Sequence, residues 1–125
     1  MNATPPTQVP WPVVVIVEDE LLVRCDLADC LREAGWMVME ATTAEDAIAL
    51  CNDGTVMHVL ITDIQLDGPA NGWDVAEAFR ASSSDVGVIY TTGNSHDRRR
   101  SVPNSLHFTK PYQPADVAVP RTRDL

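Results

Sequence analysis

The sequence predicts an α/β fold of the doubly wound class, with one parallel sheet and helices on both of its faces. Short apolar runs rich in β-branched residues, such as 13–17 and 59–62, alternate along the chain with segments of helical periodicity. Strands that alternate with helices in this way lie parallel and are joined by right-handed crossovers. With 125 residues, the chain has the size of one compact domain.

The predicted elements follow one another along the chain with no internal repeat and no second domain. The expected strands are 13–17, 36–41, 58–62, 86–91 and 105–109, and the expected helices are about 21–31, 44–51, 72–81 and a short one from 113. Residues 95–104 show no apolar periodicity, so the fourth helix is expected to be weak, and Pro120 ends the fifth helix early. We expect a disordered, Pro-rich lead over residues 1–12, a domain over 13–119 and a tail over 120–125.

Charge and composition argue against several classes of function. The net charge of −9 argues against non-specific nucleic-acid binding and against adhesion to anionic membranes. The apolar run 13–17 leads directly into acidic residues and is too short for a signal peptide or a membrane span. Cys25, Cys30 and Cys51 lack a metal-type spacing and are predicted to be reduced thiols. We therefore expect a cytoplasmic protein. Its Met start favours a whole protein, and a piece of a longer kinase or regulator is the alternative.

Polar side chains stand at the carboxyl ends of four of the predicted strands. They are Glu18 and Asp19 after the first strand, Asp63 after the third, Thr92 after the fourth and Lys110 after the fifth. The carboxyl ends of parallel strands meet at one edge of the sheet, which is where open α/β sheets bind ligands. Each group alone has an ordinary structural explanation. The placement of all five groups at the same edge of the sheet favours a ligand-binding site there.

Three carboxylates at one edge repel one another unless a cation lies among them. Oxygen ligands of this kind suit Mg²⁺, or Mn²⁺ in its place. With the hydroxyl and the ammonium group, the cation would hold a phosphoryl group through three contacts and stabilise charge that develops during its transfer. Asp63 would then be the acceptor carboxylate, which attacks phosphorus and forms an acyl phosphate.

Over about residues 12–118 the chain resembles a response-regulator receiver domain of two-component signalling. The matching stretches are VVIVEDE at 14–20, LITDIQL at 60–66, VIYTTG at 88–93 and FTKPY at 108–112. The resemblance implies a flavodoxin-like, five-stranded parallel sheet in the order 2-1-3-4-5. It also implies that Asp63 receives its phosphoryl group from a phosphohistidine on a sensor histidine kinase or a phosphotransfer protein.

The resemblance also implies roles for the other residues of the edge. Asp19 and Asp63 would bind Mg²⁺ directly, whereas Glu18 would bind it through water. Gln65 would add its backbone carbonyl. Lys110 would pair with the phosphoryl group and, before phosphorylation, with Asp63.

Thr92 would bind a phosphoryl oxygen and draw the following loop inward. Thr91 is the alternative, and Thr92 is preferred because the small residue Gly93 follows it, as in the family pattern. His107 stands where the family has its rotating switch aromatic, and the alternative is a strand residue that faces solvent. Asn94, together with Gln65, would tune hydrolysis of the acyl phosphate.

The output face departs from the family pattern. The fourth helix, fifth strand and fifth helix form the family's usual face for dimers and output, and both helices are weak here. A homodimer would therefore need a non-standard interface, and part of the fifth strand would be less covered. Arg98–Arg100 is better explained as a solvated loop than as a docking patch.

Other classes of protein fit parts of the pattern. A phosphatase or phosphotransferase with an aspartate nucleophile generally needs an acid two residues later, where this chain has Gln65. A flavodoxin-like cofactor binder needs a phosphate loop rich in Ser, Thr and Gly, where this chain has the acids of 18–20. A degenerate receiver used as a binding scaffold remains an alternative, against which all five site groups argue. We expect a signalling module with output through protein contacts, not a metabolic enzyme.

Overall fold

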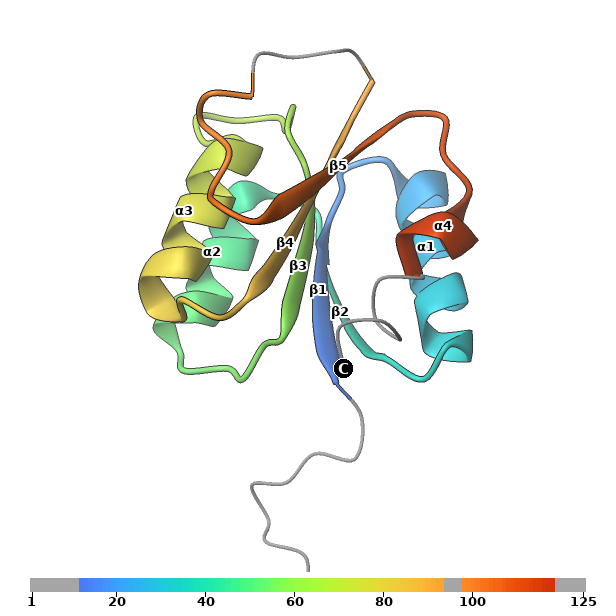
Figure 1. Cartoon of the computed structure of the whole chain (residues 1–125), viewed down its shortest axis with the longest axis horizontal. Helices are drawn as coiled ribbons and strands as arrows, with labels where there is room; N and C mark the ends of the chain where they lie inside the picture. The colour runs from blue at the N-terminus through green and yellow to red at the C-terminus, as the bar shows by residue number, and fades with distance from the viewer. Residues whose placement is uncertain (1–11, 94–97, 119–125) are drawn as a thin grey trace, which may run out of the picture.

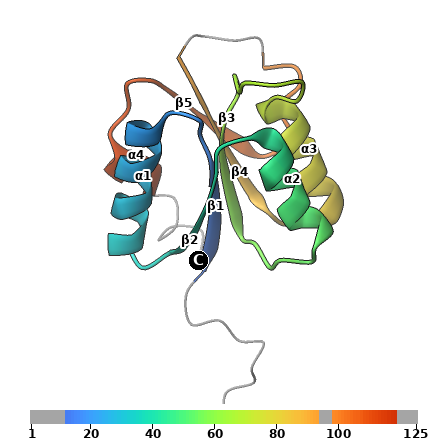
Figure 2. The same cartoon turned by 180° about the vertical axis from the view of Figure 1, so that it is seen from behind.

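The computed structural model of the chain describes residues 12–93 and 98–118. One parallel five-stranded sheet, in the order β2-β1-β3-β4-β5, has helices on both faces (Figures 1 and 2). The strands are β1 (Val13–Val17), β2 (Met37–Ala41), β3 (Val59–Asp63), β4 (Gly87–Thr92) and β5 (Ser105–Thr109). The helices are α1 (Leu21–Glu33), α2 (Ala44–Asn52), α3 (Gly72–Ser82) and α4 (Pro114–Ala118). The doubly wound fold and the predicted strand order are confirmed.

The connection between β4 and β5 departs most from the alternation of strand and helix. Its described part, residues 98–104, contains no helix, which agrees with the missing apolar periodicity. The predicted fifth helix is α4, which has five residues. The predicted lead (residues 1–11), residue Asn94 and the stretch 119–125 with Pro120 lie outside the described residues. What the sequence predicts for them stays a prediction.

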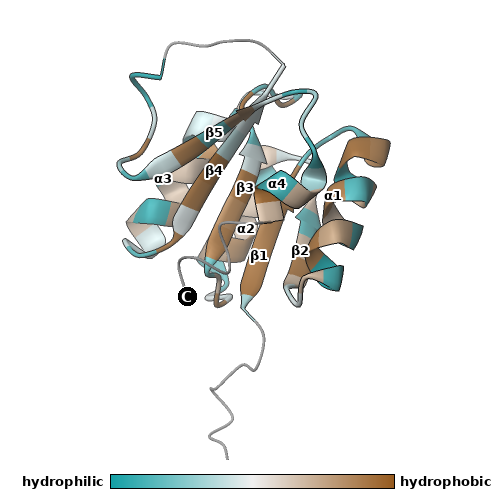
Figure 3. Ribbon diagram, turned by 45° about the vertical axis from the view of Figure 1, so that its right-hand side comes forward, coloured by the Kyte–Doolittle hydropathy of each residue, from teal (hydrophilic) through white to brown (hydrophobic). Residues whose placement is uncertain are grey.

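The apolar runs form two cores, one on each face of the sheet. Side chains of one strand alternate between the faces. Val15 and Leu60 therefore pack toward α2 and α3, whereas Ile16 and Ile61 pack toward α1 and α4. β1 is buried along its whole length because β2 and β3 flank it and helices cover both faces. Figure 3 shows the hydrophobic central strands between helices that carry both hydrophilic and hydrophobic residues.

Side-chain caps fix the starts of α2 and α3. The sequence allows Thr42 or Thr43 to begin α2, and the structure uses Thr43, whose hydroxyl accepts a hydrogen bond from the Asp46 backbone N–H at 3.1 Å. Asn71 begins α3 with a reciprocal capping box, because its side chain and that of Asp74 each bond the other's backbone N–H. The second cap determines where the loop after Asp63 enters α3.

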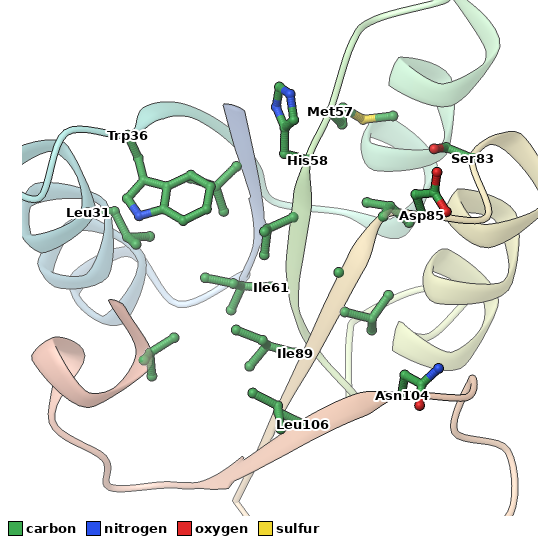
Figure 4. Close-up of a pocket in the computed structure, with 16 residues that line it drawn as sticks. Leu31, Trp36, Met57, His58, Ile61, Ser83, Asp85, Ile89, Asn104 and Leu106 are labelled. Atoms are coloured by element: carbon green, nitrogen blue, oxygen red, sulfur yellow. The ribbon is translucent and has the colours of Figure 1, made fainter. Parts of the chain in front are cut away.

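A hollow of about 430 Å³ lies on the α1 and α4 face of the sheet (Figure 4). Its lining is mainly apolar and includes Trp36, Ile61, Ile89 and Leu106. α4 is too short to cover this face fully, and Leu106 on the edge strand β5 remains exposed. This agrees with the expectation that the fifth strand is incompletely covered. None of the predicted site residues lines the hollow.

The structure also bears on two predictions from composition. All three cysteines are half-buried free thiols, and burial raises the pKa of the Cys30 and Cys51 thiols, which makes them less reactive. No helix in residues 12–93 or 98–118 has both the length and the apolar character needed to cross a lipid bilayer.

Candidate functional site

The strand ends bring the predicted acids together at one edge of the sheet, the upper edge in Figure 1. One carboxylate oxygen from each of Glu18, Asp19 and Asp63 lies within 4.8 Å of the other two. The parallel pairing of β1 with β3 sets Val17 opposite Thr62, so the acids that follow these residues emerge side by side. Glu18 and Asp63 are 3% and 7% exposed, respectively, whereas Asp19 faces solvent.

Lys110 lies between the two buried acids. Its Nζ donates to Glu18 Oε1 at 2.8 Å and to Asp63 Oδ2 at 2.9 Å. Burial alone would lower the pKa of Lys110, but the hydrogen bonds to Glu18 and Asp63 outweigh it and hold the pKa above its ordinary value. The ammonium group is therefore a fixed positive charge. The contact with Asp63 agrees with the prediction for the unphosphorylated state, and the contact with Glu18 was not foreseen.

The buried carboxyl group of Glu18 has a pKa above its ordinary value. Burial raises the pKa of Glu18, and the nearby charge of Asp63 raises it further. Hydrogen bonds from Lys110 and from the Glu20 backbone N–H act in the opposite direction without cancelling the rise. Three carboxylates against one ammonium group form a donor set that suits a hard divalent cation, and Asp19 leaves the site open to water.

Replacing Lys110 with Gln should raise the affinity of the acidic cluster for Mg²⁺ by roughly ten-fold, because removal of a nearby charge is worth about 1–2 kcal/mol there. The ammonium group contacts oxygens of Glu18 and Asp63 and competes with the ion for them. Isothermal calorimetry with Mg²⁺ measures the change. Lys110→Arg keeps the charge and should bind Mg²⁺ like the wild type. Weaker binding by the Gln variant would contradict this competition.

Thr92 and Gln65 lie beside the acidic cluster. Thr92 is buried at the end of β4, and its backbone carbonyl accepts a hydrogen bond from the Lys110 backbone N–H at 2.7 Å. Gln65 is exposed, and its backbone N–H donates to Asp63 Oδ1 at 3.2 Å. Thr91 is buried next to Thr92. The choice of Thr92 over Thr91 as the phosphoryl ligand stays a prediction.

His107 packs against the sheet and the connection that precedes β5. Its ring lies 4.9 Å from the Tyr90 ring, and its Nε2 lies 3.0 Å from Ser101 Oγ. Burial lowers the pKa of His107, and the positive charge of Arg98 lowers it further. The alternative of a solvent-facing residue is therefore wrong, because β5 directs this side chain onto Tyr90 of β4. Rotation of His107 stays a prediction.

The Arg98–Arg100 run is exposed, but it is not simply a solvated loop. The Arg100 guanidinium pairs with Glu77 at 2.8 Å and with Asp74 at 3.2 Å, both on α3. Arg100 thus ties the connection to α3. The sequence could not show this because the partners lie more than twenty residues away.

Two further residues shape the site and were missed from the sequence. Burial and the negative charge of Glu18 raise the pKa of Tyr112 to about 12, so its hydroxyl stays protonated near the acids. Gly72 packs so tightly that an added Cβ would lie 2.2 Å from the Asp63 carbonyl oxygen. Tyr112 lies in the FTKPY stretch and could have been found there, whereas Gly72 gave no local signal beyond its place at a helix start.

The fold and the position of the site place the chain among doubly wound α/β domains that carry a polar site at the carboxyl ends of their strands. Residues 14–116 match the protein family described as response regulator receiver domain. The chain therefore belongs to the receiver-domain family of two-component signalling.

Individual relatives agree with this assignment. The chain is 28% identical over 118 residues to the aerobic respiration control protein ArcA of Escherichia coli (strain K12), with 91% of this chain and 48% of ArcA covered. It is 29% identical over 125 residues to the transcriptional regulatory protein PdtaR of Mycobacterium tuberculosis (strain CDC 1551 / Oshkosh), with 90% and 58% covered. The chain thus spans about half the length of these curated relatives.

A solved structure of a response regulator receiver protein from Sinorhizobium medicae WSM419 shows the same fold. It superposes with a TM-score of 0.87 at 23% identity, and the match covers 91% of this chain and 94% of that one.

Proposed function

We propose that this chain is a phosphoacceptor signalling module, which takes a phosphoryl group on Asp63 from a sensor histidine kinase or a phosphotransfer protein. The observation that carries the proposal is the position of Lys110, whose Nζ contacts both Asp63 and Glu18 at the acidic edge. A buried carboxylate thus lies beside a fixed positive charge and a candidate cation site. Membership of the receiver family supports this assignment.

Asp63 supplies the nucleophile of the proposed transfer. One of its carboxylate oxygens attacks phosphorus, and the O–P bond forms as the P–N bond to the donor imidazole breaks. The imidazole nitrogen leaves with the electron pair and takes a proton from solvent. The product on this chain is an acyl phosphate on Asp63.

The neighbours of Asp63 stabilise the transferred group. Lys110 already lies 2.9 Å from Asp63 Oδ2, so its ammonium can hold a phosphoryl oxygen after a small movement. The hydroxyl of Thr92 would donate to a second oxygen. Mg²⁺, held by Asp19, Asp63 and the Gln65 carbonyl, and by Glu18 through water, would neutralise charge on the phosphoryl group.

Gln65 argues for a long-lived acyl phosphate and against a turnover enzyme. It stands two residues after Asp63, where a phosphatase of this type generally has an acid that protonates the leaving group. An amide cannot supply that proton. Gln65 is exposed beside Asp63 and would, with Asn94, influence where water can approach the acyl phosphate. The module assists its own phosphorylation and slowly loses the group.

The test is exposure of the full chain to a small phosphodonor with Mg²⁺, followed by intact mass measurement. We expect one phosphoryl group per chain, on the peptide that contains Asp63. Hydroxylamine should remove the group, as expected for an acyl phosphate, and chelation of Mg²⁺ should prevent its formation. Size-exclusion measurements on the same samples test for the non-standard homodimer. An unmodified wild type would contradict the proposed function.

Leu22→Asp should slow phosphoryl transfer from a histidine kinase or phosphotransfer protein by about ten-fold or more. Loss of one interface contact worth about 1.4 kcal/mol corresponds to this factor. A protein donor must bring its phosphohistidine to Asp63 and so must cover the first turn of α1, where Leu22 is 75% exposed. Radiolabelled transfer assays measure the rate.

The rate with a small phosphodonor should not change in Leu22→Asp, because that reaction involves no protein contact. Val56→Asp is the matched control, since Val56 is 62% exposed and precedes β3 at the opposite end of the strands. Equal losses in both variants would show that the effect is not specific to the docking face.

A further inference from the structure

The described part of the connection between β4 and β5, residues 98–104, has no helix, yet it packs closely on the protein. In Figure 1 this segment, drawn in orange, runs beside α3 before it enters β5. Its Val102 side chain is buried in the core beneath α3. A segment without helical hydrogen bonds is held in place by contacts from its surroundings. Those contacts decide how easily it moves.

The most buried of these contacts comes from Tyr90 on β4. The Tyr90 side chain is 0% exposed, and its hydroxyl oxygen accepts a hydrogen bond from the Val102 backbone N–H at 3.1 Å. The Trp73 ring lies 4.7 Å from the Tyr90 ring on one side, and the His107 ring lies 4.9 Å away. The two rings fix the position of the phenol. A buried backbone N–H that loses its acceptor costs more than an exposed one.

Further contacts from α3 and β5 hold the same segment, and one of them is the hydrogen bond that Ser105 Oγ donates to the Val102 carbonyl at 2.8 Å. Ser101 Oγ bonds His107 Nε2 at 3.0 Å, and Arg80 of α3 donates to the Pro103 carbonyl at 2.6 Å. Arg100 pairs with acids of α3. The arginine contacts are partly exposed, so water can replace them at small cost. The Tyr90 hydrogen bond is buried, and no such replacement is available without displacing the segment.

Tyr90 is also connected to the phosphoryl site. It lies two residues before Thr92 on β4, so both side chains point to the same face of the sheet. Thr92 ends the strand, and the connection that begins there returns to the sheet at Val102, under the Tyr90 hydroxyl. Any inward movement of the connection at its Thr92 end therefore acts against the attachment at its Val102 end.

We propose that Tyr90 is a positioning residue that holds segment 98–104 in its resting place and thereby opposes the response to phosphorylation. The proposal rests on the proposed phosphorylation of Asp63 and on contact between Thr92 and the phosphoryl group. When that group draws the connection inward, the hydrogen bond from Val102 to Tyr90 opens and the segment is released. The aromatic residue that sets the threshold is thus in β4, and His107 of β5 packs over it.

The test compares the wild type with Tyr90→Phe, which keeps the ring packing and removes only the acceptor oxygen. Each protein is titrated with beryllofluoride in the presence of Mg²⁺, and binding is followed by the NMR signal of the Trp73 indole N–H, whose ring contacts Tyr90. The beryllofluoride concentration at half-saturation, the midpoint, should be about five-fold lower in Tyr90→Phe than in the wild type. This is the factor in an equilibrium constant that corresponds to one net hydrogen bond of about 1 kcal/mol. Hydrogen exchange at the Val102 amide should be faster in the variant without beryllofluoride, and faster in the wild type once beryllofluoride is bound.

Two variants guard the interpretation. Ser101→Ala removes the hydrogen bond between the segment and His107 of β5 and should also lower the midpoint, so it tests the attachment of the segment even if Tyr90→Phe folds poorly. Thr43→Ala loses a helix-cap hydrogen bond of similar strength far from the segment and should leave the midpoint unchanged.

An equal or higher midpoint in Tyr90→Phe, with a normal wild-type response, would overturn the inference and leave the proposed function intact. A wild type that gives no response to beryllofluoride would reject the proposed function, and the role of Tyr90 with it. A lower beryllofluoride midpoint in Thr43→Ala would show that a general loss of stability governs the response, and that the attachment of segment 98–104 to Tyr90 does not.

Discussion

Replacing Asp63 with Asn should abolish phosphorylation by small phosphodonors and by protein donors alike. The amide has nearly the shape of the carboxylate but is a far weaker nucleophile, so no acyl phosphate can form. The other groups of the edge stay in place, because Lys110 keeps its 2.8 Å contact with Glu18. Intact mass measurement after exposure to the phosphodonor with Mg²⁺ should show full conversion for the wild type and none for Asp63→Asn.

The same substitution should raise the free energy of unfolding by about 1 kcal/mol in the absence of Mg²⁺. Functional sites often hold like charges close together at a cost in stability, and removal of one such charge recovers part of that cost. Asp63 is buried, and its oxygen lies within 4.8 Å of oxygens of Glu18 and Asp19, so its charge is repelled by two others. Its removal costs one ion pair with Lys110 and relieves both repulsions. Urea unfolding without Mg²⁺ measures the gain, which should shrink when Mg²⁺ neutralises the wild-type cluster.

Asp67→Asn is the matched control for the charge. Asp67 is exposed in the loop after β3, and its backbone N–H approaches Asp19 Oδ2 at 3.4 Å. Its removal takes one negative charge from the neighbourhood without touching the nucleophile. This variant should still be phosphorylated. Phosphorylation of Asp63→Asn at another residue would show that the acceptor has been assigned wrongly.

The sequence predicted which acids and which lysine meet at the sheet edge, because each of them stands next to a recognisable strand. Each strand is a short apolar run, and the polar group that matters stands directly at its end, as with Asp63 and Lys110. Parallel topology then brings these ends to one edge whatever the loops do. A similarly local pattern narrowed the start of α2 to Thr42 or Thr43, whereas the strand order was implied by the resemblance to the receiver family. The lack of a helix in residues 98–104, the described part of the connection, was also predictable, because a helix without apolar periodicity has no face to bury.

Contacts between distant residues could not be predicted in this way. Lys110 and Glu18 are 92 residues apart, and their 2.8 Å contact depends on the pairing of β1, β3, β4 and β5 in that order. The sequence places Tyr90 in a predicted strand, and only the folded chain brings the Val102 N–H to its hydroxyl. His107 was left between two orientations because residues alternate along an edge strand, and only its packing on Tyr90 decides between them.

Gly72→Ala should destabilise the fold by about 4 kcal/mol, at the upper end of what single substitutions cost, because the added methyl group overlaps backbone atoms that cannot rotate away. A Cβ on Gly72 would lie 2.2 Å from the Asp63 carbonyl oxygen and 2.7 Å from the Ile64 Cα. Gly72 is the first residue of α3, and its backbone N–H donates to the Ile64 carbonyl at 2.9 Å, so the helix start is fixed against this loop. Relief of the overlap must move α3 or the backbone at Asp63.

The loss should therefore appear in two measurements at once. Urea unfolding should show the lower stability, and the fraction that remains folded should accept a phosphoryl group more slowly, because the displaced backbone carries the Asp63 carboxylate. Gly87→Ala in β4 is the matched control: its Cβ would meet Val59 Cγ2 at 3.5 Å, an ordinary contact, so stability should change by less than about 1 kcal/mol. If Gly72→Ala were as stable and as reactive as Gly87→Ala, α3 would have to begin further from Asp63 than the structure places it.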